Sequence, residues 1–298
     1  MNKFVTIIIP SYRSKKLILT HIKKYYNYFK IIIVENSNDI AFKKLIENKY
    51  KNIDIYLKKN IGYGRAVNFA SKKVKTKFFF AINPDTKIYK NTLNNLIDAA
   101  KLINEFGAIG PIYAHHKKKY KTNSIIEKKK IIAAAMLIET KTFKRINGYD
   151  KNFFLYYEDD DYFTKCNILN LKLYQATNSF ILHKKVKHTK KKALNLHSTT
   201  FSNIDEKNST YFLGGWHGQW SKFYYLKKYN GFLYALFFCL PNNIMNIIQL
   251  IPYLFLDQTK AKYKYYKIEG FVCALIGLPS FKRSKFDKKY IFNTQNYR

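Results

Sequence analysis

The first hundred residues alternate between short apolar runs and amphipathic stretches, and this alternation constrains the fold more than any other feature of the chain. The apolar runs are rich in Ile, Val and Phe without polar alternation, which is typical of strands buried on both faces. Regular strand–helix alternation predicts right-handed crossovers and an α/β fold with a mostly parallel central sheet. The predicted strands are residues 4–10, 31–35, 53–57 and 78–82, and the predicted helices are residues 17–29, 41–48 and 64–73.

Polar and turn-forming residues follow each of the four predicted strands. Each set alone is what an ordinary turn or helix cap would use. Because parallel strands end at one edge, and ligands of such sheets bind beyond the carboxyl ends, we expect the four sets to line one nucleotide-sized cleft. They are residues 10–13 (PSYR), 35–39 (ENSND), 60–68 (NIGYGRAVN) and 83–86 (NPDT).

Asp85 and His183 are candidate metal ligands at this edge. Asp85 ends an apolar strand, where a carboxylate suits either a hard divalent cation that holds a diphosphate or an ordinary Pro-Asp turn. His183 follows a further predicted strand, residues 171–182. A single histidine in such a place is usually structural or on the surface, but this one could complete a metal site with Asp85.

Four consecutive acidic residues, Glu158 to Asp161, follow an aromatic run. They stand out because the chain has 19 acidic residues against 54 Lys and Arg. Adjacent carboxylates shift one another's pKa values and resist joint ionisation. A bound metal, a proton-transfer role or a helix N-terminus whose dipole favours carboxylates would each explain the cluster, and the residues alone leave these three open.

The composition argues against several classes of protein. The formal net charge is +35, but only five of the 54 basic residues are arginine. A lysine-dominated excess without a recognisable binding module argues against nucleic acid as the partner, and it favours anionic lipid headgroups and diphosphates. Three widely spaced cysteines predict neither disulfides nor a zinc site. The N-terminus enters an apolar strand without a signal-peptide pattern, so we expect a cytoplasmic protein.

The most apolar stretch of the chain is residues 231–257, and Pro241 lies inside it. We expect the proline to divide it into halves, each shorter than the ~20 residues of a spanning helix. A buried helical hairpin is one interpretation. We favour the other, an interfacial segment lying on the anionic inner face of the cell membrane. Lysines flank it at positions 222, 227, 228, 260, 262, 264 and 267.

Five motifs in order resemble those of the family 2 inverting glycosyltransferases that use nucleotide sugars, especially the bacterial rhamnosyltransferase-like branch. They cover roughly the first two thirds of the chain. The chain departs from the pattern where Glu35 replaces the usual Asp, and His183 is followed by lysines rather than the commoner glycine-containing loop. The second departure leaves the choice between His183 and His188 open. The motifs are IIIPSYR, IIIVENSND, NIGYGRAVN, NPDT, and IAAAMLI followed by NGYD and FFLYYEDDD.

The resemblance implies a nucleotide-sugar-binding glycosyltransferase A-type fold, a divalent metal (Mg or Mn), and a role for each matching residue. Asp159 would be the catalytic base, within an acidic motif that begins with Glu158, and Asp85 would bind the metal. His183 would bind the metal or the diphosphate. The nucleotide-binding residues would be Pro10, Ser11, Tyr12 and Glu35 at the base and ribose, Asn60, Gly62, Arg65 and Asn68 at the ribose or diphosphate, and Asn83 beside Asp85.

The residues also fit this chemistry without the resemblance. Inverting transfer needs one base for the acceptor hydroxyl and positive charge for the departing nucleoside diphosphate. We therefore expect metal-assisted transfer of a sugar, for which rhamnose is one candidate, from a nucleoside-diphosphate donor to a glycan acceptor. We expect this acceptor to be linked to a lipid and to become part of a surface polysaccharide. Residues 1–207 would form the catalytic domain, and residues 208–298 a helical, apolar and basic region that associates with the membrane.

Three other hypotheses remain at this point. A nucleotidyltransferase would require a glycine-rich phosphate-binding loop early in the chain, but the segment PSYRSKK after the first predicted strand contains no glycine. A basic nucleic-acid-binding protein would carry a recognisable module and bind with steep salt dependence. A membrane-surface protein with a degenerate transferase site would bind lipid but turn over no donor.

Overall fold

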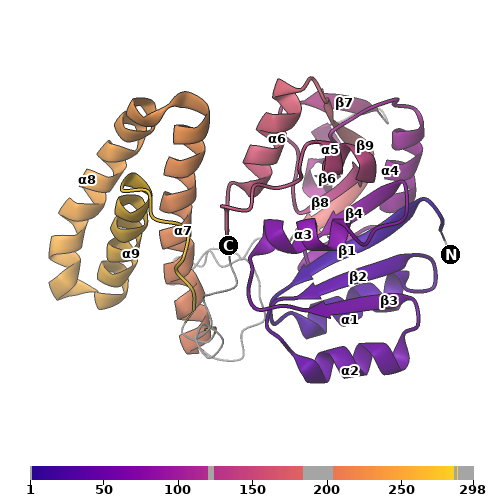
Figure 1. The fold of residues 1–298 in the computed structure, drawn as a ribbon, viewed down its shortest axis with the longest axis horizontal. Helices are drawn as coiled ribbons and strands as arrows, with labels where there is room; N and C mark the ends of the chain where they lie inside the picture. The colour runs from indigo at the N-terminus through magenta and orange to yellow at the C-terminus, as the bar shows by residue number, and fades with distance from the viewer. Residues whose placement is uncertain (1, 120–123, 184–203, 285–286, 288–298) are drawn as a thin grey trace. The chain divides into compact units, whose positions relative to one another are not determined.

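The computed structural model describes residues 2–119, 124–183, 204–284 and 287, and the chain divides into two compact units (Figure 1). Among the described residues, unit 1 comprises residues 2–119, 124–150 and 159–183. Unit 2 comprises residues 151–158, 204–284 and 287, so a short segment of unit 2 interrupts unit 1 along the chain.

Unit 1 is an α/β structure, as predicted, built on a sheet that has nine strands within the described residues. The strand order is β3-β2-β1-β4-β8-β6-β9-β5, and β7 pairs with β9. The neighbours β3, β2, β1 and β4 are all parallel, so the four strand ends that the sequence singled out meet at one edge. The later strands add four antiparallel pairs in the described part of the chain, so the sheet is mixed and not mostly parallel as we expected from the first half of the chain. The strands are β1 (Val5–Ser11), β2 (Lys30–Glu35), β3 (Ile53–Leu57), β4 (Phe78–Ile82), β5 (Thr86–Ile88), β6 (Ala108–Tyr113), β7 (Ile125–Lys128), β8 (Ala135–Glu139) and β9 (Leu173–His183).

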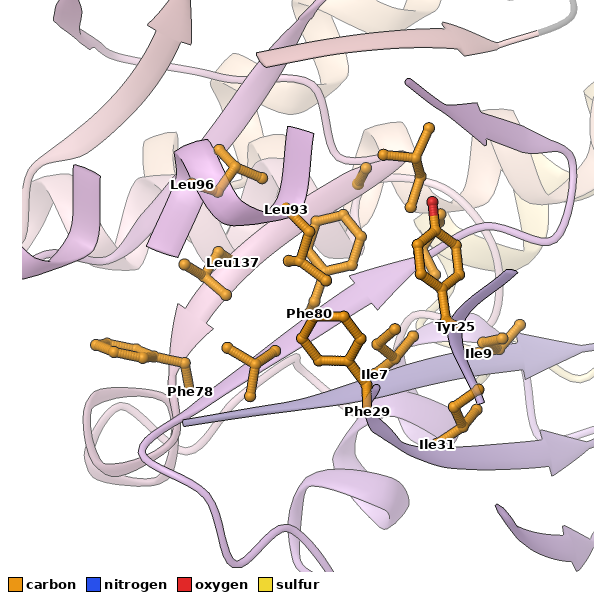
Figure 2. Close-up of a cluster of buried hydrophobic side chains, with 14 of the residues drawn as sticks. Ile7, Ile9, Tyr25, Phe29, Ile31, Phe78, Phe80, Leu93, Leu96 and Leu137 are labelled. Atoms are coloured by element: carbon orange, nitrogen blue, oxygen red, sulfur yellow. The ribbon is translucent and has the colours of Figure 1, made fainter. Parts of the chain in front are cut away.

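Helices cover both faces of the sheet in unit 1, which explains why the central strands β1, β2 and β4 are largely apolar and buried. In β1, Ile7 and Ile9 enter one hydrophobic cluster while Ile8 enters the other, since successive side chains of a strand point to opposite faces. Figure 2 shows the first cluster, where Phe80 lies among aromatic and aliphatic side chains of the covering helices. The helices are α1 (Lys15–Tyr25), α2 (Ile40–Lys49), α3 (Tyr63–Ser71), α4 (Thr92–Lys101), the short 3₁₀ helix η1 (Ala114–Lys119), α5 (Thr140–Arg145) and α6 (Glu158–Ile168).

Unit 2 consists of three long helices in its described part: α7 (Ile204–Asn230), α8 (Phe232–Leu256) and α9 (Gln258–Leu275). Its core contains Phe153, Trp216, Trp220 and Phe223. The helical C-terminal region is as predicted.

The expectation that Pro241 divides the apolar stretch is wrong, because α8 runs unbroken for 25 residues with Pro241 and Pro252 inside it. A proline within a helix costs about 3 kcal/mol through a lost hydrogen bond and a clash with the preceding turn. Packing of α8 against α7 and α9, through Ala235 and Cys239 among others, offsets that cost. Among the described residues, α8 alone is long and apolar enough to cross a membrane, by length and composition.

Candidate active site

Glu35 organises the loops at the ends of β1 and β2. Its side chain is only 1% exposed, and its carboxylate accepts hydrogen bonds from the Ser11 hydroxyl and from both the backbone N–H and the hydroxyl of Ser37. The backbone ladder continues past the strands, since Asn36 N donates to Ser11 O at 2.7 Å and Lys58 N donates to Glu35 O at 2.9 Å. The buried side chain of Glu35, which stands where the family motif usually has Asp, therefore links the loop after β1 to the loop after β2.

The loop after β3 is tied to the loop after β2. Asn36 Nδ2 donates to Gly62 O at 3.3 Å, and Gly62 N donates to Asn60 Oδ1 at 3.3 Å. Gly62 has φ +84°, a left-handed conformation that favours glycine, and it directly precedes α3. The loops that carry Glu35, Asn60 and Gly62 thus lie next to one another, as we predicted from the order of the strands.

The other predicted nucleotide residues of these loops differ in their accessibility. Pro10 is buried within β1, whereas Tyr12 and Arg65 are half-buried. The Arg13 guanidinium lies 5.6 Å from the centre of the Tyr12 ring. Tyr12 and Arg65 are therefore partly open to solvent beside the buried Glu35, and their contact with a nucleotide stays a prediction.

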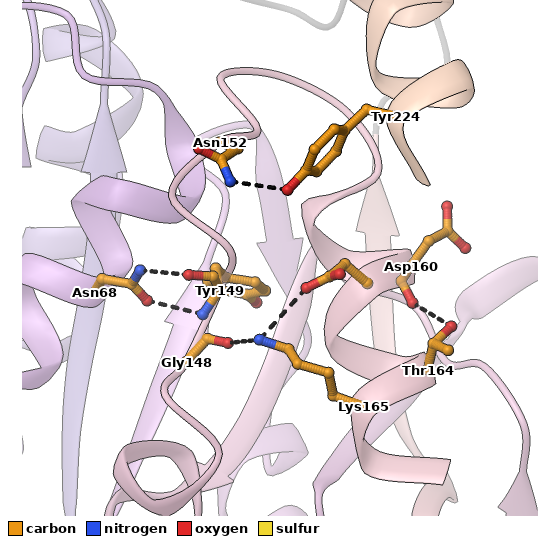
Figure 3. A network of polar contacts seen from close by, with 9 residues as sticks. Asn68, Gly148, Tyr149, Asn152, Asp160, Thr164, Lys165 and Tyr224 are labelled. Atoms are coloured by element: carbon orange, nitrogen blue, oxygen red, sulfur yellow. Dashed lines mark hydrogen bonds and ion pairs between the residues drawn. The ribbon is translucent and has the colours of Figure 1, made fainter. Parts of the chain in front are cut away.

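Asn68 holds a turn of the protein. Its Nδ2 donates to Tyr149 O at 2.8 Å, and its Oδ1 accepts from Tyr149 N at 2.9 Å (Figure 3). Lys165 of α6 donates to Gly148 O and lies 3.4 Å from the Asp161 carboxylate. The turn is thereby fixed from both α3 and α6. Because this turn uses both polar atoms of the Asn68 amide, its predicted contact with the ribose or diphosphate remains a prediction.

The turn that carries Asp85 connects β4 to β5. Asn83 N donates to Ala134 O at 2.9 Å, and Thr86 N donates to Asn83 O at 3.1 Å. Asn83 and Asp85 are both half-buried at the sheet edge. These backbone bonds hold the turn closed while the Asp85 side chain stays partly accessible.

His21 of α1 also supports this turn, and the sequence analysis did not identify it. Its Nε2 lies 3.0 Å from Pro84 O. Burial lowers the pKa of His21, so the ring is neutral at pH 7 and Nε2–H can donate to the carbonyl. Asp85 also lies close enough to Tyr113 to contribute, after burial, to the raised pKa of that phenol. Nothing local in the sequence of α1 distinguishes His21 from a surface histidine.

The backbone places His183 beside the Asp85 turn, because the last residue of β9 pairs with Thr86 in the antiparallel β5–β9 ladder. Of His183 only the backbone is described, and His188 lies outside the described residues. Within the described part of the chain, no group of three or more His, Cys, Asp or Glu side chains could hold a metal. Mg²⁺ typically takes one or two protein carboxylates and completes its shell with water and substrate phosphates, so Asp85 at a strand end fits such an ion.

The structure separates the four consecutive acids of α6 by environment. Asp161 is 0% exposed and pairs with Lys165, while Glu158 is 7% exposed. Asp160 pairs with Lys130, whose ammonium group is largely exposed. Asp159 is half-buried, and burial, followed by the charge of Asp160, raises its pKa above the ordinary value. Asp159 therefore combines partial accessibility with a raised pKa, which suits a general base.

The segment before α6 adopts an unusual backbone. Tyr156 and Tyr157 have φ +67° and +65°, a left-handed conformation that is rare for non-glycine residues. Such strain costs about 1–3 kcal/mol per residue and persists where the surroundings hold it. In unit 2, Ser221 Oγ of α7 donates to Leu155 O at 2.9 Å, and Asn152 Nδ2 donates to Tyr224 OH at 2.8 Å (Figure 3).

Aromatic contacts fix the same segment within unit 2. The Phe153 ring lies 5.0 Å from that of Tyr224, and the Tyr157 ring lies 5.3 Å from that of Tyr225. Phe154 stacks near His217 at 4.7 Å. The chain that enters α6 is thus anchored along α7, and Glu158 at its end contributes to the raised pKa of Tyr156. No local sequence pattern predicts these long-range contacts.

Comparison with known proteins assigns the family. Residues 6–177 match the model of Glycosyl transferase family 2, which is more than half of the chain. The polar edge at the ends of β1 to β4 and the acidic start of α6 both lie within this matched region. The chain belongs to glycosyl transferase family 2 and is a glycosyltransferase. A comparison with curated proteins gave no match.

Several solved structures share the fold at low sequence identity. The mannosyltransferase PcManGT from Pyrobaculum calidifontis, in complex with GDP-Man and Mn²⁺, has a TM-score of 0.52 and 11% identity, covering 91% of this chain and 86% of its own. Residues 1–349 of TarS from S. aureus, in complex with UDP-GlcNAc, have a TM-score of 0.51 and 12% identity, covering 92% of both chains. GalNAc-T7 with UDP, GalNAc and Mn²⁺ has a TM-score of 0.50 and 11% identity; the match covers 60% of this chain and only 43% of that one.

Proposed function

We propose that this glycosyltransferase is an inverting enzyme in which Asp159 removes the proton of the acceptor hydroxyl. The observation that carries the proposal is the sorting of the four acids in α6. Asp161 and Glu158 are buried, Asp160 is paired with Lys130, and Asp159 is half-buried with a raised pKa. Lys130 opposes part of that rise, which favours ionised Asp159 at neutral pH.

The proposed reaction is a direct displacement. The acceptor oxygen attacks the anomeric carbon while Asp159 takes its proton, and the bond from that carbon to the diphosphate oxygen breaks with inversion. Asp85, with His183 as second ligand, would hold a Mg or Mn ion. When bound, that ion neutralises the charge that develops on the leaving diphosphate. The Mn²⁺ in the structures of GalNAc-T7 and PcManGT supports a divalent cofactor.

The donor we propose is a nucleoside-diphosphate sugar, with rhamnose as the sugar that the motif resemblance favours. The structures of PcManGT with GDP-Man and TarS with UDP-GlcNAc support this donor class. As acceptor we propose a lipid-linked glycan of a bacterial surface polysaccharide, reached from the cytoplasmic side of the membrane. In this proposal residues 1–207 carry the chemistry and residues 208–298 associate with the membrane, and the apolar helix α8 supports that division.

A pair of asparagine substitutions tests the base. Asp159→Asn keeps the size of the side chain but cannot accept the proton, so we expect kcat to fall about 10²- to 10⁴-fold. Asp160→Asn, one position along the same helix turn, should stay within a few fold of the wild type. Both variants should still be stabilised by the donor. Wild-type activity in Asp159→Asn, with an unchanged circular dichroism spectrum, would remove Asp159 from this role.

A thermal-shift screen identifies the donor and tests the metal together. A ligand that binds the folded protein raises its melting temperature by mass action. We expect one class of nucleoside-diphosphate sugar to do so with Mn²⁺ and much less after chelation, and we expect Asp85→Asn to lose the metal-dependent part. If no donor stabilises the protein with or without metal, the site is degenerate and the proposal fails.

A further inference from the structure

Helix α8 exposes a continuous apolar surface. It contains no charged residue over 25 positions, in a chain in which 24% of residues are charged. Fourteen of the 25 are large hydrophobic side chains exposed to solvent, among which Phe237 is 72% and Phe255 is 85% exposed. Monomeric soluble proteins rarely leave an apolar patch of this extent uncovered. This surface, the exposed side of Phe232–Leu256, is called the α8 face below.

Of the four amide side chains of α8, Asn243, Asn246 and Gln249 point into unit 2, and Asn242 is exposed. Asn243 and Asn246 are buried. Asn243 Nδ2 lies 3.3 Å from Gln219 Oε1 of α7, and Lys264 of α9 donates to Asn246 Oδ1 at 3.1 Å. A helix on the surface of a soluble protein has the reverse arrangement, with its polar side in water and its apolar side in the core. The inverted polarity indicates that the α8 face has an apolar environment in the working protein.

Lysines border the α8 face. The ammonium of Lys222 lies 4.7 Å from the centre of the Phe238 ring, that of Lys227 lies 5.7 Å from Phe232, and that of Lys260 lies 5.2 Å from Tyr253. Lysines at such a border cover apolar surface with their stems and present the charge to a polar layer. An apolar face with a cationic border matches the acyl chains and anionic headgroups of a bilayer.

The cations of this region are also close to one another. Burial lowers the pKa of Lys267, and the nearby charges of Lys264 and Lys222 lower it further. An anionic group placed among these ammonium groups would relieve that repulsion, since an opposite charge stabilises the protonated form.

We propose that the α8 face lies in the plane of an anionic lipid bilayer, at the boundary between headgroups and acyl chains, with the bordering lysines at the phosphates. The helix lies in the plane rather than across the bilayer, because its inner side packs on α7 and α9 through amides and a lysine that do not belong in hydrocarbon. This inference rests on the membrane association proposed above for residues 208–298 and specifies the face, the lipid and the orientation, but it does not depend on the proposed reaction.

A second copy of the chain is the competing occupant of the α8 face. Two copies that met there would bring two cationic borders together, each from a chain of formal net charge +35. Like charges opposed across an interface weaken it, whereas anionic headgroups neutralise them. The charge therefore favours lipid.

Flotation of the full chain with vesicles tests the inference. We expect the protein to float with phosphatidylglycerol-containing vesicles and to remain largely unbound with pure phosphatidylcholine. Phe237→Glu, Ile248→Glu and Phe255→Glu together place three charges on the α8 face without touching its packed side, and should weaken binding ~10-fold or more. The matched control puts the same charges on exposed apolar positions of unit 1: Leu102→Glu, Ile168→Glu and Leu169→Glu.

The outcomes separate the alternatives. Unchanged flotation of the α8-face variant, or an equal loss in the control, would overturn the inference. So would a wild-type dimer, measured by light scattering, that ignores vesicles and dissociates in the α8-face variant. The thermal shift with donor, measured without vesicles, should be the same in the wild type and both variants, so a failure of lipid binding is distinguishable from a failure of the proposed reaction.

A fluorescent probe distinguishes a helix in the plane from one that spans. Cys166, Cys239 and Cys273 are all buried, so a probe attached at Leu233→Cys or Phe255→Cys, at the two ends of α8, labels the introduced thiol selectively. We expect both positions to shift to the blue on vesicles and both to remain open to a quencher added outside. Protection of one end alone would show that α8 crosses the bilayer and overturn the in-plane arrangement.

Discussion

Units 1 and 2 distribute polar and apolar side chains in opposite ways. In unit 1 the sheet is buried under helices on both faces, and buried polar residues such as Ser11 and Glu35 gather at its carboxyl edge. In unit 2 buried polar residues such as His217 and Asn246 lie between the helices, while α8 exposes its apolar side chains. The difference teaches where the proposed contact with a bilayer would lie, because within the part of the chain that the structure describes only unit 2 exposes a long apolar helix face.

The largest effect we expect in this comparison is the loss of unit 2 stability in acid. His217 is buried, with Nδ1 3.0 Å from Ser280 Oγ and Nε2 2.9 Å from Lys282 O. Burial and the neighbouring charge of Arg283 lower the pKa of His217 to about 3, from an ordinary value of 6.5. Between pH 6.5 and about 3, His217 is therefore protonated in the unfolded chain but not in the folded chain. The free energy of unfolding is highest above pH 6.5 and falls as the pH drops towards 3, by up to about 5 kcal/mol.

Tryptophan fluorescence can measure this effect in unit 2 alone, because the only two tryptophans, Trp216 and Trp220, lie in α7. Urea titrations from pH 7 to pH 4 should show the decline in the wild type. His217→Gln keeps a donor and an acceptor but does not titrate, so its decline should be shallower. Parallel curves for the two proteins would show that His217 does not link unit 2 to pH.

The next effect concerns how closely the helices of unit 2 approach. A Cβ added at Gly270 of α9 would lie 2.2 Å from the carbonyl oxygen of Trp216 in α7, a backbone atom that cannot turn aside. We expect Gly270→Ala to destabilise unit 2 by about 1–3 kcal/mol or more in denaturant titrations followed by fluorescence.

Gly218→Ala is the matched control within α7. The nearest atom to its added Cβ is Tyr156 Cδ2 at 3.9 Å, an ordinary contact. The higher helix propensity of alanine should leave this variant as stable as the wild type or more so, by up to about 1 kcal/mol. If both variants lose the same stability, close packing of α7 on α9 is not what holds unit 2 together.

The smallest effect concerns the polar contacts inside unit 2. Lys264 donates to Asn246 Oδ1 at 3.1 Å and to Gln249 Oε1, both on α8. Lys264→Met removes these bonds and should cost about 1 kcal/mol in the free energy of unfolding. Lys262→Met, on the exposed side of the same helix, should cost less than about 0.5 kcal/mol. A more stable Lys264→Met protein would mean that the inner polar contacts of α8 do not stabilise unit 2.

The first half of the fold followed closely from the sequence. Strands 53–57 and 78–82 have the predicted bounds. Residues 78–82 form a continuous apolar run that is buried on both faces, whereas in 53–57 only Ile53 and Ile55 are buried. The antiparallel strand β8 was not predicted, since its pairing with β4 joins Phe80 to Leu137 across a long stretch of chain. The unbroken α8 was mispredicted, because the effect of Pro241 depends on packing that no local pattern encodes.

The sequence identified the residues of the candidate site but not the relations among them. It placed Asn68 among the nucleotide contacts, which stays a prediction, but it gave no sign that the amide of Asn68 also holds the backbone of Tyr149. It also gave no sign that His21 supports the Asp85 turn through Pro84 O. Both contacts join residues more than sixty positions apart, and so depend on how the chain folds back.

The sequence by itself determined the α/β class and the sheet edge at which polar residues gather, because both follow from short-range periodicity and from strand order along the chain. Only the tertiary structure decided that Asp159 is half-buried with a raised pKa, whereas Asp161 is buried beside Lys165 and Asp160 pairs with Lys130. It also decided that α8 turns Asn243 and Asn246 inward and most of its large apolar side chains outward. Burial and charge pairing set both outcomes, and they depend on partners such as Lys130 and Lys264 that the chain brings close only when folded.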